Sequence, residues 1–200
     1  MNIGVLALQG GFVEHIRMLK EFNVNCIEIR QKSDIITHHF DGIIFPGGES
    51  SVIGKLLREL DLFEPLKKMI ECGLPVFGTC AGMILLAKHI VNDQRTHFGV
   101  LDIHVRRNAY GKQSGSFKTI DVFKGLGKIP MVFIRAPYIE KVGENIEVLS
   151  VINNNIVAVK QNNIIVTSFH PELTTDSSVH RLFISVIQAS NDNKLQKIDV

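Results

Sequence analysis

The stretch that most constrains this chain is G-T-C-A-G at residues 78–82, where a cysteine stands between two closely spaced glycines. An apolar run at 74–77 precedes it, and a helix-like run at 83–88 follows it. A strand-to-helix turn of this kind lifts one reactive side chain above the sheet, and glycine supplies the unusual dihedral angles. The helix N-terminus also favours the nucleophilic thiolate. The pattern predicts that Cys80 is a nucleophile; the alternative is a buried apolar cysteine without chemical role.

Strand-like and helix-like segments alternate through the first half of the chain. This alternation predicts parallel strands with helices on both faces of the sheet, and ligands of such sheets bind beyond the carboxyl ends of the strands. Gln9-Gly10, residues 46–48 and Cys80 each follow an expected strand, so we expect them along one edge. The expected strands are 3–8, 24–30, 43–45 and 74–77; helices are expected at 52–60, 62–71 and 83–88, after residue 12 and after residue 33.

The second half consists mainly of short strand candidates separated by Asn-rich or Gly-rich turns. Residues 151–152 and 156–157 flank three asparagines and are typical of a hairpin, which predicts antiparallel pairing added to a parallel core. A final helix is expected around residues 182–187, and the polar segment from residue 190 is expected to fray. The candidate strands are 100–105, 116–123, 131–134, 147–152, 156–160 and 164–168.

The expected fold is therefore a single α/β domain over residues 1–189, followed by a polar C-terminal tail at 190–200. It is a three-layer sandwich with a largely parallel central sheet and a small antiparallel extension. Two hundred residues suffice to bury a substantial core without disulfides or metal.

Composition argues against several classes of partner. The formal net charge of +2 gives no electrostatic argument for nucleic acid or an anionic membrane. No apolar run approaches the roughly 20 residues of a membrane helix. Three unevenly spaced cysteines without a C-x-x-C pair predict neither a disulfide framework nor a zinc site. Since the N-terminal residues also lack the pattern of a signal peptide, we expect a cytoplasmic protein.

His170 is the histidine placed best to act with Cys80, because it ends the apolar strand candidate 164–168 and is followed by proline. Glu172 lies two residues on, and in extended chain such residues project to the same side. Glu172 can then hold one ring nitrogen of His170 while the other faces Cys80; the alternative is that Glu172 only caps residues 174–176. The other seven histidines, His15 and His180 among them, are expected to be surface or structural residues.

Acyl transfer to a cysteine also needs donors for an oxyanion. The Ala81 N–H directly follows the nucleophile and can supply one. The Gly47-Gly48 loop can supply another, from Gly48, because glycine backbone approaches a ligand closely. An isolated P-G-G stretch would otherwise be an ordinary turn.

Three motifs in this order and spacing resemble the class I glutamine amidotransferases of the triad type: P-G-G-E-S at 46–50, G-T-C-A-G at 78–82 and H-P-E at 170–172. Three further stretches narrow the resemblance to the glutaminase subunits of pyridoxal 5'-phosphate synthase: L-Q-G at 8–10 with Glu14-His15, R-N-A-Y-G at 107–111, and F-I-R-A-P at 133–137. The match covers residues 3–183. Gly11 stands where this family more often has alanine.

The resemblance implies a flavodoxin-like fold, glutamine hydrolysis without metal or organic cofactor, and a role for each matching residue. Cys80 is the nucleophile, and His170 with Glu172 forms the relay. An arginine fork suits the α-carboxylate of glutamine, although Arg135 can instead offer its backbone; Arg106 is expected to be a solvated surface residue. The implied glutamine contacts are Gly48, Glu49, Ser50, Arg107, Ile134 and Arg135.

The resemblance also implies a partner, because the ammonia needs an acceptor and the chain has no phosphate-cradling G-x-x-x-x-G-K-[ST] loop. The expected partner is a (β/α)8-barrel synthase subunit in an assembly of twelve and twelve chains. Gln9 and Gly10 are expected to face it.

Three other interpretations stay open at this point. The chain could be the glutaminase subunit of another biosynthetic amidotransferase, which would share the triad. A cysteine peptidase or a DJ-1-like protein could use a similar elbow without needing Arg107 and Arg135. A non-enzymatic binding module is the third.

Overall fold

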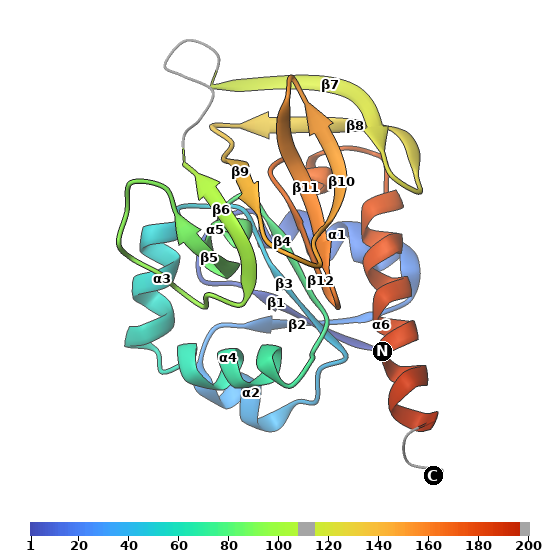
Figure 1. Cartoon of the computed structure of the whole chain (residues 1–200). Helices are drawn as coiled ribbons and strands as arrows, with labels where there is room; N and C mark the ends of the chain where they lie inside the picture. Colours follow the sequence, from blue (N-terminus) through green and yellow to red (C-terminus); the bar gives the residue numbers. More distant parts are fainter. Residues whose placement is uncertain (108–114, 197–200) are drawn as a thin grey trace.

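The computed structural model describes residues 1–107 and 115–196, with the backbone alone for residues 194–196. Its centre is five parallel strands in the order β2-β1-β3-β4-β12 (Figure 1). The expected parallel core of the first half is therefore confirmed, and the last strand of the chain completes it. The bounds are β1 (Asn2–Leu6), β2 (Asn25–Ile29), β3 (Gly42–Phe45), β4 (Val76–Thr79) and β12 (Ile164–Thr167).

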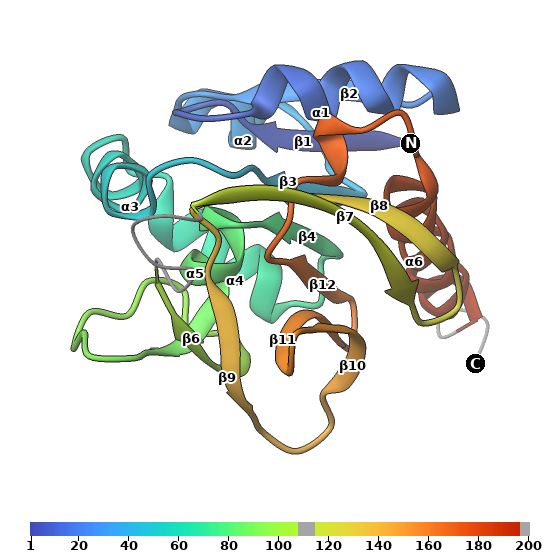
Figure 2. The ribbon, with the colours of Figure 1, turned by 90° about the horizontal axis from the view of Figure 1, so that it is seen from above.

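Adjacent residues on these strands enter different hydrophobic cores, because successive side chains of a strand point to opposite faces. On β3, Ile43 and Phe45 join the core under α3, α4 and α5, whereas Ile44 joins the core under α1 and α6. Figure 2 shows the sheet between these helices. The three layers agree with the expected sandwich. The helices are α1 (Phe12–Leu19), η1 (Lys20–Phe22), α2 (Lys32–Thr37), α3 (Ser50–Glu59), α4 (Phe63–Glu71), α5 (Ala81–Leu86), η2 (Pro171–Leu173) and α6 (Ser178–Gln196).

Beyond β12 the sheet continues through β11, β9, β6 and β5. The pairings of β12 with β11, β11 with β9 and β9 with β6 are antiparallel. The expected hairpin at the three asparagines is β10 pairing with β11. Strands β7 and β8 form a separate antiparallel ribbon over the α1 and α6 side. The bounds are β5 (Ala87–Ile90), β6 (Leu101–Arg106), β7 (Ser116–Phe123), β8 (Gly127–Ile134), β9 (Tyr138–Val142), β10 (Glu147–Ile152) and β11 (Asn155–Gln161).

Three local expectations need correction. The expected helix over 83–88 ends at Leu86, and β5 follows because its residues pair with β6. Strand β9 is absent from the expected set, since its five residues gain their strand character from pairing with β6 and β11 rather than from a local pattern.

The final helix begins earlier and ends later than expected, and residues 190–196 do not fray. Ser190 is buried and accepts a hydrogen bond from Asn163 Nδ2 (3.3 Å), and Asn191 Nδ2 donates to Asp41 Oδ1 (3.2 Å). These tertiary contacts hold polar residues in the helix, which local composition alone does not indicate.

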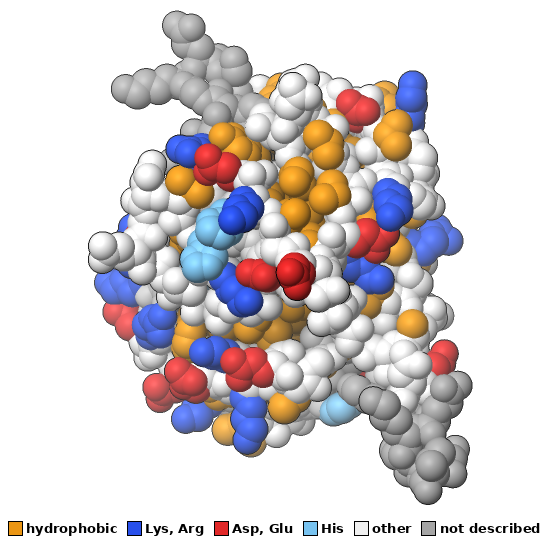
Figure 3. Space-filling model, viewed as in Figure 1, with side chains coloured by type: hydrophobic (Ala, Val, Ile, Leu, Met, Phe, Trp, Pro, Cys, Tyr) orange, Lys and Arg blue, Asp and Glu red, His pale blue; other side chains and the backbone are white. Residues whose placement is uncertain are grey.

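Positive and negative side chains lie interspersed on the face seen in Figure 3. Within the described residues, no helix combines the length and apolar character needed to cross a membrane.

Candidate active site

A pocket of about 480 Å³ lies where β1, β3, β4 and β12 end. Most residues singled out from the sequence line it, although they come from distant parts of the chain. Ala81, the remaining predicted site residue, is buried directly after Cys80 at the start of α5. The lining includes Gln9, Gly10, Gly11, Gly47, Gly48, Glu49, Ser50, Cys80, Arg107, Ile134, Arg135, His170 and Glu172.

Cys80 occupies the sharp turn between β4 and α5, with φ 48° and ψ −98°. This backbone conformation is rare for a residue with a β-carbon and is held by its surroundings. The Cys80 N–H donates to the carbonyl of Thr167 on β12 (2.8 Å), and the Cys80 carbonyl accepts from the Ile84 N–H. A β-carbon at Gly82 would lie 2.1 Å from the Phe45 carbonyl oxygen, so glycine there lets helix and sheet approach.

His170 and Glu172 form a buried pair: His170 Nδ1 lies 2.7 Å from Glu172 Oε1. The predicted contact is present, but its backbone geometry differs from the expectation. Glu172 lies in the 3₁₀ turn η2 rather than in extended chain, and Pro171 begins that turn. Glu172 therefore faces His170 and does not cap residues 174–176.

Burial of the His170 ring disfavours its charged form, but hydrogen bonds with Cys80 and Glu172 outweigh burial and raise the pKa of His170 to about 10. The pKa of Glu172 is lowered even though burial opposes this, because His15 and His170 favour the carboxylate. His170 is therefore an imidazolium near neutral pH, set between the cysteine sulfur and a carboxylate.

Two glycine-rich loops interlock beside this pair. The Gly47 carbonyl accepts from the Gly11 N–H (3.0 Å), and a β-carbon at Gly10 would lie 1.8 Å from the same oxygen. Because a trans peptide is planar, the Gly48 N–H points away from Gly11, opposite to the Gly47 carbonyl.

Gln9 is tied to the same loop. Its Oε1 accepts from the Glu49 N–H (2.7 Å) and lies where a β-carbon at Gly48 would be only 2.4 Å away. The Gln9 side chain is half-buried, whereas Gly10 is exposed. Gln9 thus fixes the position of the Glu49 backbone.

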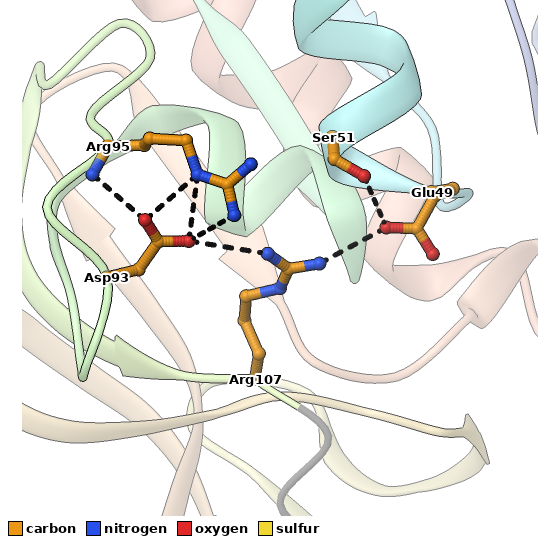
Figure 4. Close-up of polar contacts among 5 residues, drawn as sticks. All are labelled: Glu49, Ser51, Asp93, Arg95 and Arg107. Carbon is orange, nitrogen blue, oxygen red and sulfur yellow. Dashed lines mark hydrogen bonds and ion pairs between the residues drawn. The ribbon is translucent and has the colours of Figure 1, made fainter.

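Arg107 reaches the pocket from the end of β6, and Figure 4 shows it between two carboxylates. Arg107 Nη2 lies 3.2 Å from Glu49 Oε1, and its Nη1 lies 3.6 Å from Asp93 Oδ2. Asp93 also binds the Arg95 guanidinium through both carboxylate oxygens, and Arg95 lowers the pKa of Asp93. Sequence reasoning missed Asp93, because residues 92–97 carry no motif.

The other implied glutamine contacts lie around the pocket mouth or wall. Ser50 is buried at the start of α3, and Ile134 is exposed at the end of β8. Arg135 has φ 42°, and its N–H donates to the Gly115 carbonyl. Arg106, expected to be a solvated surface residue, forms an ion pair with Glu140 (2.9 Å). Residues 108–111 of the R-N-A-Y-G motif lie outside the described residues.

Two histidines that the sequence places among surface or structural residues are fully buried behind the pocket. His15 Nε2 lies 3.5 Å from Glu172 Oε2, and His15 Nδ1 lies 2.9 Å from His180 Nε2. The one feature of the sequence that could have pointed to His15 is the Glu14-His15 pair in the family-like stretch after β1. Within the part of the chain that the structure describes, no three His, Cys, Asp or Glu side chains are grouped to hold a metal ion.

A cysteine on a strand-to-helix elbow, an imidazole–carboxylate pair after the neighbouring strand and a glycine loop facing both define a class I glutamine amidotransferase. A solved structure described as a glutamine amidotransferase matches with a TM-score of 0.87 and 43% identity, over 93% of this chain and 98% of that one. The model of the SNO glutamine amidotransferase family matches residues 5–189, and the chain belongs to that family.

Relatives named pyridoxal 5'-phosphate synthase subunit PdxT match over nearly their whole length. The one from Haemophilus influenzae is 53% identical over 95% of this chain and all of the relative. The one from Desulfitobacterium hafniense is 52% identical over 94% of each chain.

Proposed function

We propose that this chain is the glutaminase subunit of a pyridoxal 5'-phosphate synthase, which hydrolyses L-glutamine to L-glutamate and ammonia. The observation that carries the proposal is the His170 ring, which lies 2.7 Å from Glu172 Oε1 through Nδ1 and lines the same pocket at the strand ends as Cys80. The full-length similarity to subunits of that name supports the same function.

The reaction begins with attack of the Cys80 thiolate on the side-chain amide carbon of glutamine, which forms a C–S bond and an oxyanion. His170 gives its proton to the amide nitrogen, the C–N bond breaks, and ammonia leaves a γ-glutamyl thioester. Glu172 fixes the ring orientation and stabilises the imidazolium.

Water completes the cycle. His170, now neutral, takes a proton from water as the oxygen attacks the thioester carbon, and the C–S bond breaks to release glutamate and the thiolate. The N–H groups of Ala81 and Gly48 bind the oxyanion in both steps.

The charged side chains at the pocket select free glutamine. Arg107 and Arg135 attract the α-carboxylate, and Glu49 attracts the α-ammonium group. These groups distinguish an amino acid from a peptide, in which neither end of an internal glutamine is charged.

The ammonia passes to a (β/α)8-barrel synthase subunit, with twelve copies of each chain in the assembly, in the cytoplasm. Gln9 and Gly10 face this partner. The Gln9 side chain also holds the Glu49 N–H, next to the Gly48 N–H that binds the oxyanion. A partner that contacts Gln9 therefore influences the position of this donor.

The test is a glutaminase assay with and without the synthase subunit, on wild type, Cys80→Ala and the control Cys72→Ala, whose thiol is exposed. We expect Cys80→Ala to lose at least about 10³-fold in kcat and Cys72→Ala to match wild type, and we expect added synthase to raise the wild-type rate. Full activity of Cys80→Ala would overturn the nucleophile. A rate indifferent to the synthase would overturn the coupling.

A further inference from the structure

A chain of polar side chains continues behind Glu172 into the core. His15 on α1 is fully buried, with Nε2 3.2 Å from Thr79 Oγ1 and 3.5 Å from Glu172 Oε2. Its Nδ1 lies 2.9 Å from His180 Nε2, on α6. Side chains from β4, η2 and α6, all far from α1 in sequence, thus meet at one imidazole, on the side of Glu172 away from His170.

The two oxygens of the Glu172 carboxylate have different surroundings. Oε1 binds His170 Nδ1, whereas Oε2 is buried and makes no hydrogen bond within the usual limit among the described residues. A buried carboxylate needs partners for both oxygens. His15 Nε2, at 3.5 Å, is a donor placed to serve Oε2 after a small movement.

The hydrogen-bond pattern assigns one tautomer to each buried imidazole. His180 Nδ1 makes no hydrogen bond, so a proton there would be a buried donor without an acceptor. With its proton on Nε2, His180 donates to His15 Nδ1, and the His15 proton must then be on Nε2, facing Thr79 and Glu172. Burial lowers the pKa of both rings, to about 3 for His180, so each carries one proton.

We propose that His15 is a positioning residue for glutamine hydrolysis: its Nε2–H holds the second oxygen of Glu172, and His180 fixes the tautomer that makes this possible. The inference rests on the proposed function. A carboxylate held at one oxygen can rotate away from its imidazole, whereas one held at both keeps Oε1 on His170. The connected side chains that orient His170, the base that serves Cys80, therefore extend as far as His180 on α6.

A purely packing role explains this arrangement poorly. Both rings stand edge-on to Phe77, at centroid distances of 5.8 Å for His15 and 5.5 Å for His180. An apolar side chain would fill this space without the desolvation cost of two buried imidazoles. Among the described residues, the polar contacts of this histidine pair lead to Glu172 and Thr79.

The test compares His15→Leu, which removes the donor, with His15→Gln, whose amide N–H₂ can occupy the position of Nε2–H. Loss of such an outer contact typically costs about 10- to 100-fold. We expect kcat of His15→Leu to fall in that range with KM within about twofold of wild type, because no atom of His15 lines the pocket. His15→Gln should recover most of the rate.

Phe183→Leu is the matched control for core disruption, since Phe183 lies on α6 and packs on the same Phe77. Thermal unfolding of each variant reports folding separately, and we expect the control to lose stability while keeping kcat. A wild-type kcat in His15→Leu, or a rate in His15→Gln as low as in His15→Leu, would overturn the proposal.

A double-mutant cycle keeps the proposal testable if His15→Leu folds poorly. His180→Gln should lower kcat a few-fold, and the double variant with His15→Gln should be no slower than the slower single variant, since both act through one contact. Multiplied effects would contradict a shared chain. A wild type without glutaminase activity would instead refute the proposed function itself.

Discussion

Gly47 lies directly against the imidazole of His170: a β-carbon at position 47 would be 2.2 Å from the ring Cε1 and 2.9 Å from Nδ1. The ring is therefore confined between this loop and Glu172, which holds Nδ1 at 2.7 Å. The loop that carries a proposed oxyanion donor and the proposed base thus fix one another's position. Any side chain at position 47 must displace the ring or the loop.

The first prediction concerns this contact. Gly47→Ala should reduce kcat by about 10²-fold, the usual consequence of displacing a catalytic group by about 1 Å. Gly11→Ala is the control, because a β-carbon there would meet only ordinary contacts at 3.6 Å from Glu14 and Glu172. Steady-state glutamine hydrolysis measures both variants, and equal rates for them would disprove the steric argument.

The second prediction concerns the protonation of His170. Its folded-state pKa is raised from 6.5 to about 10, so the charged ring stabilises the fold. This stabilisation is fully present below about pH 6.5 and is lost as the pH rises through about 10. Cys80→Ala removes one of the two groups that raise the pKa, so His170 should titrate lower in that variant. Nitrogen-15 NMR of the histidine rings from pH 5 to 11 gives both values, and identical titrations would show that Cys80 does not contribute.

The third prediction concerns the backbone at Cys80, whose φ of 48° with ψ −98° is accessible mainly to glycine. Cys80→Gly and Cys80→Ala both lose the sulfur and differ in backbone strain. We expect the glycine variant to be more stable than the alanine variant by about 1 kcal/mol, the reverse of the usual order. Urea unfolding compares the two, and a more stable alanine variant would mean that this turn stores no strain.

Much of the architecture follows from patterns within the sequence. The apolar runs that become β1, β3 and β12 are buried on both faces, and such runs are typical of parallel strands. Strand β9 and the C-terminal half of α6 could not be predicted this way, because each depends on partners distant in sequence.

The residues of the candidate site fall into the same two groups, those predictable from local sequence and those that depend on contacts made in the fold. Cys80, His170 and the glycine loops carry their own local signatures, since a sharp turn or a strand end requires particular residues. Asp93 carries no such signature, and the Glu14-His15 stretch marks His15 without indicating what it contacts. His15 contributes through Glu172, far along the chain, and Asp93 through Arg107 at the end of β6. Only the folded structure brings the two members of each pair together.

The last prediction concerns Asp93. It lies 3.6 Å from the Arg107 guanidinium, which also contacts Glu49 (3.2 Å), so it should hold Arg107 in place for the glutamine α-carboxylate. Ion pairs at the molecular surface are weak even when half-buried, as this one is, so Asp93→Asn should raise KM for glutamine only about threefold, with kcat unchanged. Arg107→Ala removes a charged donor itself and should raise KM by about 10-fold or more.

The matched control for Asp93→Asn is Glu140→Gln, which breaks the ion pair of the adjacent Arg106 (2.9 Å). Arg106 and Glu140 do not line the pocket, so KM should stay at the wild-type value. If both variants raise KM equally, the effect belongs to the net charge of this face and not to Arg107. If Asp93→Asn lowers kcat instead, Arg107 acts on the reacting amide rather than on the substrate's α-carboxylate.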